Sequence, residues 1–407
     1  MSLNIVERGE PERDWRGPAV LGDGFRAFFP LAALYAIVAI PAYLAVLAGQ
    51  GMPFDRLPAI SWHAHEMLYG YGAATLGGFL LTAVPNWTGA APVRGGRLLA
   101  LVLIWLAGRL ALWLGNIVPP ATAGVVDLLF LPALGAMVAP ALLGARNRRN
   151  YMFFVLLGLM FAGNALIHGA LADLLSPELG RRGEFLALDI FLMMIALIGG
   201  RILPAFTANY LRQQNAGKEV AVRPWLDRAT LASMAAIVLA DLALGDRHPI
   251  LGALCLVAAA VNLLRLSGWR GAATLKEMSL GVLHLGYAWL AAGLLLRGID
   301  ILWTPFVGAA ALHALTIGAI GTMTMGVMTR AVLGHTGRPL RATPRLVAAY
   351  GLISLAAVLR VLGGAFSALD YAQVLGLAGL CWVAAYVVFL SVIGPIALRP
   401  RADGKPG

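Results

Sequence analysis

Long apolar runs alternate with short, polar, turn-rich segments along this chain, from Phe25 to Leu398. Each run holds about 20 residues, and a helix of that length crosses the ~30 Å hydrocarbon core of a bilayer. The pattern predicts about twelve such helices. We place them near residues 24–48, 60–84, 98–115, 121–144, 151–172, 184–208, 229–244, 249–267, 277–298, 306–330, 346–364 and 369–397. We therefore expect an all-α, polytopic transmembrane helix bundle whose main partner is the lipid bilayer.

The composition agrees with this prediction. Of the 407 residues, 60% are hydrophobic and only 13% are charged, whereas about a quarter of the residues of a soluble domain are charged. No stretch is polar enough to form a separate soluble domain. We expect a cytoplasmic N-terminal segment (1–23), a transmembrane domain (24–398) and a cytoplasmic tail (399–407). Residues 1–23 mix acids and bases and do not form a cleavable signal.

The net charge of +11 would fit nucleic-acid binding, but its distribution indicates another cause. Lys and Arg are concentrated in every second connecting segment, beginning with the N-terminus and ending with the C-terminus. Such alternation is what the positive-inside rule requires of an even number of spans. We expect both termini, and the long loop near 209–228, to be cytoplasmic, and we expect no nucleic-acid partner.

A weak internal sequence similarity relates the second predicted span to the tenth. Counted from His65 and from His313, glycines and a Thr-Gly pair recur at the same distances. The matching positions are Gly70 and Gly318, Gly78 and Gly326, and Thr88-Gly89 and Thr336-Gly337. Spans 2, 6 and 10 are four apart, which predicts three repeats of four helices. The alternative is chance matching in a chain with 48 glycines.

Two histidines and a carboxylate begin the second span. His63 and His65 are two residues apart, which separates them by ~200° on a regular helix. Either both converge from an irregular first turn, or one points into the bundle and the other toward water. Glu66 is placed to orient a histidine, as metal-bound imidazole generally requires. The alternative is a polar cap at the membrane interface, with Trp62 as a belt residue.

The predicted topology places further histidines at similar depth. His313 lies about two turns, or ~10 Å, inside span 10 from its outer end, and His168 lies near the outer end of span 5. With His63 and His65, four histidines thus fall in the outer half of the bundle. They could supply axial haem ligands, a copper site, or both. Taken singly, each is more often a hydrogen-bonded structural residue.

A second set of candidates lies toward the inner half. His284 enters from the cytoplasmic side, and Arg26, Arg201 and Arg330 also fall toward the inner half. Guanidinium groups pair with carboxylates and phosphates, so this layer could bind haem propionates or an anionic substrate. The alternative is that these arginines cap helix ends or reach lipid headgroups.

Sulfur-containing residues offer weaker signals. Met325 and Met328 share a face of span 10, and thioether sulfur suits Cu(I), but methionine more commonly fills the core. Cys255 and Cys381 lie in apolar spans, and we expect no disulfide or thiolate metal site. The chain has no Cys-x-x-Cys-His motif for covalent haem and no phosphate-binding loop.

Several segments resemble the NnrS family. They are 63–71, 78–89, 105–109, 199–207, the tenth span through Gly337-Arg338-Pro339, and the early Phe25-Arg26-Ala27-Phe28-Phe29. The resemblance covers nearly the whole chain. It implies a multi-pass protein of the bacterial inner (cytoplasmic) membrane that contains haem b and copper. It also implies a link to nitric oxide metabolism and resistance to nitrosative stress, with nitric oxide as the small-molecule ligand. It names no ligand residues, so the candidates remain those chosen from depth and chemistry.

Three functions compete. The first is nitric oxide defence with haem and copper, in which turnover of nitric oxide, protection of iron pools and sensing all stay open. A full haem-copper oxidase centre requires more histidines, including an adjacent pair. The second is a secondary transporter, although its buried acids would be few, mainly Glu66, Asp189 and Asp241. The third is an assembly factor that carries copper or haem to another enzyme. Oligomeric state, stoichiometry and electron donor stay open.

Overall fold

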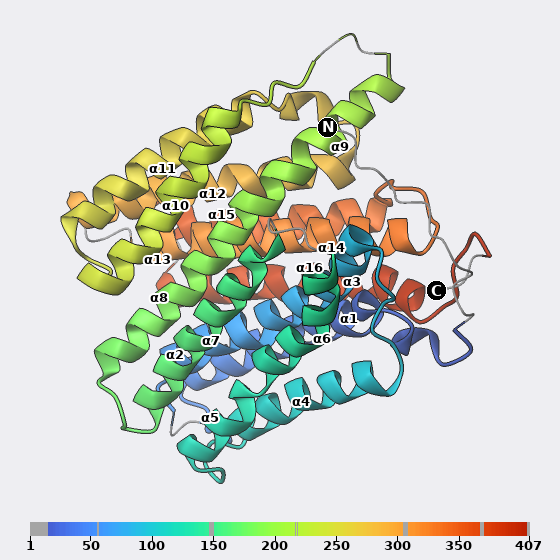
Figure 1. Cartoon of the computed structure of the whole chain (residues 1–407). Helices are drawn as coiled ribbons and strands as arrows, with labels where there is room; N and C mark the ends of the chain where they lie inside the picture. Colours follow the sequence, from blue (N-terminus) through green and yellow to red (C-terminus); the bar gives the residue numbers. More distant parts are fainter. Residues whose placement is uncertain are drawn as a thin grey trace. The chain divides into compact units, whose positions relative to one another are not determined.

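A computed structural model describes residues 15–54, 57–145, 150–215, 217, 219–303, 308–366 and 370–404. Throughout that part of the chain the regular structure is helical (Figure 1). In this part of the chain, short 3₁₀ turns such as η1 (Ala19–Leu21) and η5 (Gly271–Thr274) accompany twelve long helical runs. In chain order the runs are α1 (Gly24–Leu47); α2 (Ala59–His65), η2 (Glu66–Gly72) and α3 (Ala73–Thr88); α4 (Gly96–Trp113); α5 (Pro120–Leu128) and α6 (Phe130–Gly144); α7 (Met152–Leu171); α8 (Pro177–Met194), η4 (Ile195–Gly199) and α9 (Gly200–Gln213); α10 (Pro224–Leu244); α11 (Pro249–Ser267); α12 (Met278–Leu302); α13 (Gly308–His313), η6 (Ala314–Gly321) and α14 (Thr322–His335); α15 (Pro344–Phe366); and α16 (Tyr371–Ala397).

The predicted all-α, multi-pass architecture is confirmed. Among the described residues, 11 helical runs are long and apolar enough to cross a membrane. The remaining run, α10, has the length but carries the charges of Asp227, Arg228 and Asp241. The side of the membrane on which each terminus lies stays a prediction.

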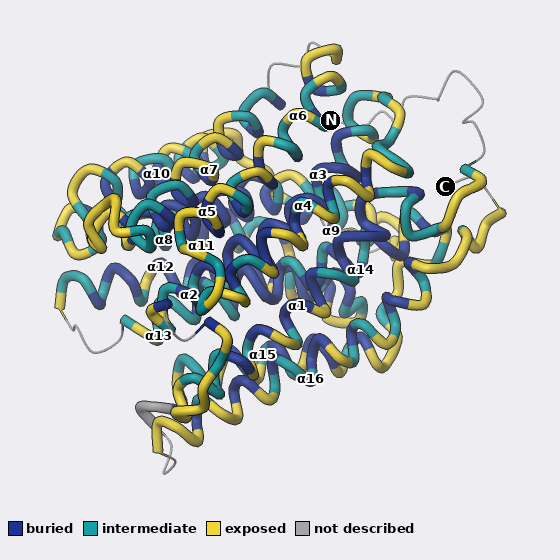
Figure 2. The backbone as a smooth tube through the Cα atoms, turned by 90° about the horizontal axis from the view of Figure 1, so that it is seen from below, coloured by how far each residue is buried: buried dark blue, intermediate teal, exposed yellow. Residues whose placement is uncertain are grey.

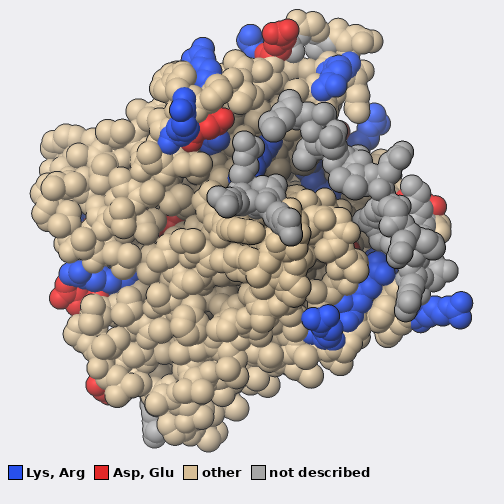
Figure 3. Space-filling model, in the orientation of Figure 1, with Lys and Arg blue, Asp and Glu red and all other residues tan. Residues whose placement is uncertain are grey.

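The outward-facing side chains suit contact with lipid. Large apolar residues such as Leu239, Leu263 and Leu380 are exposed by 60% or more. Most of the face seen in Figure 3 carries no charged side chain. Buried, half-buried and exposed positions alternate along the helices in Figure 2. An apolar exterior with few charged side chains is expected where hydrocarbon rather than water surrounds the protein.

The chain forms two compact units. The first contains residues 1–184, 330–339 and 390–407, and within it α1 packs on α3 and α5 packs on α4 and α7. The second contains residues 185–329 and 340–389. Within it α11 packs between α10 and α12, and these three helices lie side by side in Figure 1.

Among the described residues, three spans are interrupted by wider, π-helical turns: η2, η4 and η6. They lie in the second, sixth and tenth helical runs. The glycine matches in the sequence relate the second run to the tenth, and the sixth falls midway between them. His65 ends α2 directly before η2, and His313 ends α13 directly before η6. Insertions of this kind are rare and often mark functional sites. The shared position supports the predicted three repeats, which remain a prediction.

A buried arginine stabilises the irregular turn at η4. Arg265 Nη1 donates to the main-chain oxygen of Ala196 at 2.7 Å, and its Nε donates to Asp227 at 2.8 Å. The guanidinium group lies 5.2 Å from the Trp269 ring centroid. The main chain of Gly200 contacts the same guanidinium so closely that a Cβ atom would overlap it. The absence of a side chain at Gly200 therefore makes this interaction possible.

Arg26 joins the two ends of the first unit. Its side chain is 1% exposed and Nη1 donates to the main-chain oxygens of Ala397 and Arg399 at 2.9 and 2.7 Å. These carbonyls lie at the C-terminal end of α16, where they have no partners within the helix. Arg26 thus caps α16. The prediction that it also binds haem propionates or an anion stays a prediction.

Candidate metal centre

Aromatic packing positions the start of the second span. Trp62 is 1% exposed and stacks on Phe54 with ring centroids 3.8 Å apart, while Trp113 meets it edge-on at 5.5 Å. The alternative that Trp62 is an interfacial belt residue is therefore wrong, because its indole lies in the core of the first unit. This packing holds α2 in place one residue before the histidine pair.

The two histidines of α2 point in different directions. His65 is buried, whereas His63 is half-buried and stacks on Tyr43 with ring centroids 4.1 Å apart. The two rings therefore do not converge: His65 points into the bundle, and His63 packs on Tyr43. The ring of Tyr69, four residues on from His65, lies 5.1 Å from it, as expected for two positions on one face.

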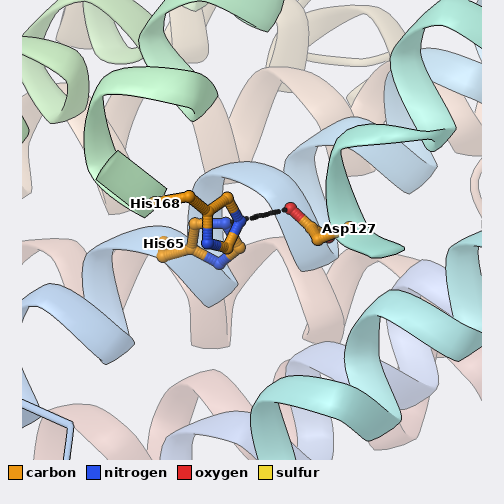
Figure 4. Close-up of side chains that lie close together, drawn as sticks. All are labelled: His65, Asp127 and His168. Atoms are coloured by element: carbon orange, nitrogen blue, oxygen red, sulfur yellow. Dashed lines mark hydrogen bonds and ion pairs between the residues drawn. The ribbon is translucent and has the colours of Figure 1, made fainter. Parts of the chain in front are cut away.

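His65 meets Asp127 of α5 and His168 of α7 in a buried cluster (Figure 4). Nε2 of His65 lies 3.2 Å from Oδ2 of Asp127, and Nε2 of His168 lies 2.9 Å from the same oxygen. The three potential ligand atoms lie within 4.8 Å of one another. Two imidazole nitrogens and one carboxylate oxygen from three helices form a donor set that suits a transition-metal ion.

Arg109 of α4 connects this cluster to Glu66. Its Nη1 donates to Oε1 of Glu66 at 2.5 Å, and its Nη2 donates to Oδ1 of Asp127. The same Oε1 atom lies 2.8 Å from Nδ1 of His65. Asn164 of α7 donates through Nδ2 to Asp127 at 2.7 Å, which turns its Oδ1 toward Nε2 of His65 at 2.9 Å. All five side chains are buried.

Both ring nitrogens of His65 therefore face oxygen acceptors. A neutral imidazole has one N–H group, so it can donate to Glu66 or toward Asp127 and Asn164, but not to both. Arg109 contributes one positive charge, while Glu66 and Asp127 contribute two negative charges. A further proton or a metal ion at Nε2 would satisfy the second nitrogen and balance the charge. An unbalanced charge is costly in so apolar a setting.

His168 presents one nitrogen to the cluster. Its ring lies edge-on to that of His65, with centroids 4.9 Å apart. Nδ1 of His168 has no hydrogen-bond partner among the described residues. Gly124 of α5 packs against this ring, where a Cβ atom would lie 3.0 Å from Cβ of His168. Glycine at this position lets α5 approach α7 closely enough for Asp127 to reach the histidines.

The chain matches the family described as NnrS protein over residues 19–401. That range contains every residue of the buried cluster. The chain belongs to the NnrS family. A comparison with curated proteins found no match. The suspected resemblance is thereby confirmed, and the chain is a multi-pass membrane protein of the NnrS type.

The remaining candidate histidines of this NnrS protein belong to the second unit. His284 of α12 is buried, and its Nε2 lies 2.8 Å from Oγ1 of Thr207. His313 is half-buried, and its Nδ1 donates to the main-chain oxygen of Ala309 at 2.7 Å. Of the four histidines predicted at one depth, the structure brings His65 and His168 together. The predicted ligand roles of His63, His284 and His313 stay predictions.

The other predicted positions are dispersed. Arg201 is exposed on α9, and Arg330 is half-buried on α14. Met325 and Met328 are fully buried, which agrees with a packing role. Cys255 is buried and Cys381 partly buried, and both thiols are free.

The sequence interpretation missed Asp127, Arg109 and Asn164 as members of the site. A signal was present, since Asp127 and Arg109 are charged residues inside apolar spans, where such residues rarely lack a use. Arg109 also falls within a segment that resembles the family. Their meeting with His65 depends on packing between helices, which the pattern along the chain does not specify.

Proposed function

We propose that this NnrS protein binds copper through His65, Asp127 and His168. We further propose that it acts in nitric oxide metabolism or resistance to nitrosative stress at the bacterial inner membrane. The observation that supports this most directly is the convergence of Nε2 of His65, Nε2 of His168 and Oδ2 of Asp127 in a buried cluster with excess negative charge. Family membership supports the link to nitric oxide.

The chemistry of the donor set fits copper. Imidazole nitrogen is a common copper ligand, and a monovalent ion would bring the formal charge of Arg109, Glu66, Asp127 and the metal to zero. Glu66 would orient His65 from the outer shell. Arg109 would hold both carboxylates in position, and the surrounding helices would exclude water. When bound, copper would supply one-electron chemistry and a site for a small diatomic ligand.

For haem b, His313 offers the best-fitting axial donor of this chain. Its Nδ1 is engaged with the main-chain oxygen of Ala309, which would leave Nε2 for iron. A hydrogen bond from the second ring nitrogen is the usual support of a metal-bound histidine. His284 fits less well, because its Nε2 is already paired with Thr207.

Asp127→Asn tests the copper proposal. We expect this variant, and His168→Ala, to lose at least ~10-fold in copper affinity, measured by competition with a chromophoric chelator. Asp173→Asn is the matched control, because Asp173 is exposed and has a left-handed φ of 57° that asparagine tolerates. The haem absorbance and its response to nitric oxide should persist in Asp127→Asn. Unchanged copper affinity in both site variants would contradict the proposal.

A secondary transporter is the second candidate. Discontinuous helices are typical of transporter sites, and the spans that contain η2, η4 and η6 are interrupted by π-helical turns. Detergent-purified protein, expressed with ample haem and copper, that contains neither iron nor copper and has no Soret band would favour this function over the first. An assembly factor would instead bind metal loosely and show no reaction with nitric oxide.

A further inference from the structure

A second buried charge cluster lies within the second unit. It contains Asp189 of α8, Asp241 of α10 and Arg297 of α12, and each side chain is 4% exposed or less. Nη1 of Arg297 donates to Oδ1 of Asp189 at 2.8 Å, and Nη2 donates to Oδ2 of Asp241. One guanidinium group thus holds a carboxyl group on each of two other helices.

The two remaining carboxyl oxygens are unsatisfied. Oδ2 of Asp189 and Oδ1 of Asp241 are buried and have no hydrogen-bond donor among the described residues. Because both carboxyl groups contact the two terminal nitrogens of one guanidinium group, they lie side by side. Two ionised carboxylates in contact repel each other, and such pairs commonly retain one proton between them.

In the part of the chain that the structure describes, Arg297 is the basic residue that contacts these two acids. The thiol of Cys255 on α11 also lies near both acids and carries no positive charge. The Phe185 ring covers Arg297, with its centroid 4.9 Å from Cζ. Asp300, the next acid along α12, is already paired with Arg247. With both acids ionised, the cluster would therefore carry one uncompensated negative charge in an apolar environment.

We propose that Asp189 and Asp241 form a site for one exchangeable proton. The proton bridges Oδ2 of Asp189 and Oδ1 of Asp241 as a single O–H···O hydrogen bond, and Arg297 is the fixed counter-ion of the remaining carboxylate. This arrangement satisfies both orphaned oxygens and makes the cluster neutral. It is independent of the copper proposal, because no residue is shared between the two clusters.

The position of the pair indicates how a proton would reach it. Asp241 lies in the last turn of α10, and Arg297 lies near the C-terminal end of α12. The Lys and Arg pattern predicts that these helix ends face away from the cytoplasm. The pair is thus placed to exchange a proton with the outer side, as a proton-coupled reaction or transport step requires.

Infrared spectroscopy of the detergent-purified protein tests the proposal. At pH 7 we expect a carboxylic acid C=O band that shifts in D2O and disappears at higher pH. Asp189→Asn and Asp241→Asn should each lose this band, whereas Asp300→Asn, the matched buried control, should keep it. Absence of such a band in the unaltered protein, or its persistence in both asparagine variants, would overturn the proposal.

Thermal unfolding distinguishes between a bound proton and a bound metal cation at this site. Each single asparagine variant should fold, because asparagine replaces a neutral acid, while the double variant leaves Arg297 without a counter-ion and should unfold at a clearly lower temperature. Stability that rises with added Na⁺ in the unaltered protein, but not in the single variants, would show that a cation occupies the site and overturn the proposal. If the single variants fail to fold, the infrared band of the unaltered protein still tests the proposal. The band should disappear as the pH rises, both in the unaltered protein and in Asp300→Asn, and a band that does not change with pH would overturn the proposal.

Discussion

Arg109 shows how single residues allow a polar site in an apolar bundle. Its guanidinium group contacts a carboxylate on either side, Glu66 and Asp127, and these in turn face His65 and His168. Lysine could not reproduce this arrangement, because a compact ammonium group lacks the planar fork that binds two acceptors in fixed directions. The positions of the candidate ligand atoms thus depend on a residue that is not itself a candidate ligand.

Arg109→Gln should destabilise the protein strongly. Removing the guanidinium leaves two buried carboxylates unpaired, which costs about 3–5 kcal/mol for a broken buried ion pair. Thermal unfolding of detergent-purified protein measures the effect. Arg182→Gln is the control, because Arg182 pairs with Glu178, whose side chain is 73% exposed, and exposed pairs contribute about 0–1 kcal/mol. Equal shifts in the two variants would show that the buried pairs do not stabilise the fold.

Asp23 gives the protein a pH-dependent stability. It is the N-cap residue of α1, before the membrane-spanning helix, and burial raises the pKa of its carboxyl group from 3.8 to about 6 against the opposing effects of Gly24 N–H and of Arg94 and Arg26. Between these values the folded chain keeps a proton that the unfolded chain releases. The free energy of unfolding therefore falls as the pH rises through this window and levels off above it.

Asp23→Asn removes this contribution, and asparagine is as well suited as aspartate to the position before a helix. We expect the variant to unfold at a higher temperature than the unaltered protein at pH 7, and the difference to shrink toward pH 4. Melting curves across this range provide the check, with Asp173→Asn as an exposed control. A difference that is constant with pH would contradict the assignment to Asp23.

At the scale of the element, the π-helical turns distinguish three spans from the rest. The runs that contain η2, η4 and η6 are, with α12, the most buried of the candidate spans. A wider turn changes the direction in which side chains point and releases main-chain groups from the regular α-helical pattern. At η2 the change begins directly after His65. At η4 the Ala196 carbonyl faces Arg265.

Gly200→Ala should disturb η4. The added methyl group would overlap the Arg265 guanidinium and push it away from Ala196 and Asp227, so the melting temperature should fall. Gly351→Ala on α15 is the matched control, because no atom lies within 4 Å of its added Cβ. An alanine in an open helical position should be neutral or stabilising by up to ~1 kcal/mol. A smaller loss in Gly200→Ala than in the control would contradict this account of η4.

At the scale of the whole molecule, the loops rather than the helices determine orientation. Lys and Arg recur in alternate connecting segments, which predicts that the loop after α7 faces outward and the loop after α11 faces the cytoplasm. Both loops contain exposed residues suited to labelling, Ser176 and Lys276.

Single cysteine substitutions at these positions test the orientation. On intact cells a membrane-impermeant maleimide should label Ser176→Cys and leave Lys276→Cys unlabelled until the membrane is opened. Cys255 and Cys381, buried and partly buried, provide the background in the unaltered protein. The reverse labelling pattern would invert the predicted topology.

Much of the fold follows from the sequence alone. Apolar runs of membrane-spanning length and the alternation of Lys and Arg are local properties, so they predicted twelve helices, the bilayer and a bundle without a soluble domain. Local motifs also identified the family and singled out His65 and Glu66.

Tertiary structure alone decided which polar groups meet. Arg109 contacts residues 43 and 18 positions away along the chain, and His65 contacts Asn164 at a separation of 99 residues. His63 likewise points away from His65 only in the folded chain. Arg26 caps the end of α16 by donating to a main-chain oxygen 371 residues away. Helix periodicity fixes the face on which a side chain lies, but the partner across that face depends on how the helices pack.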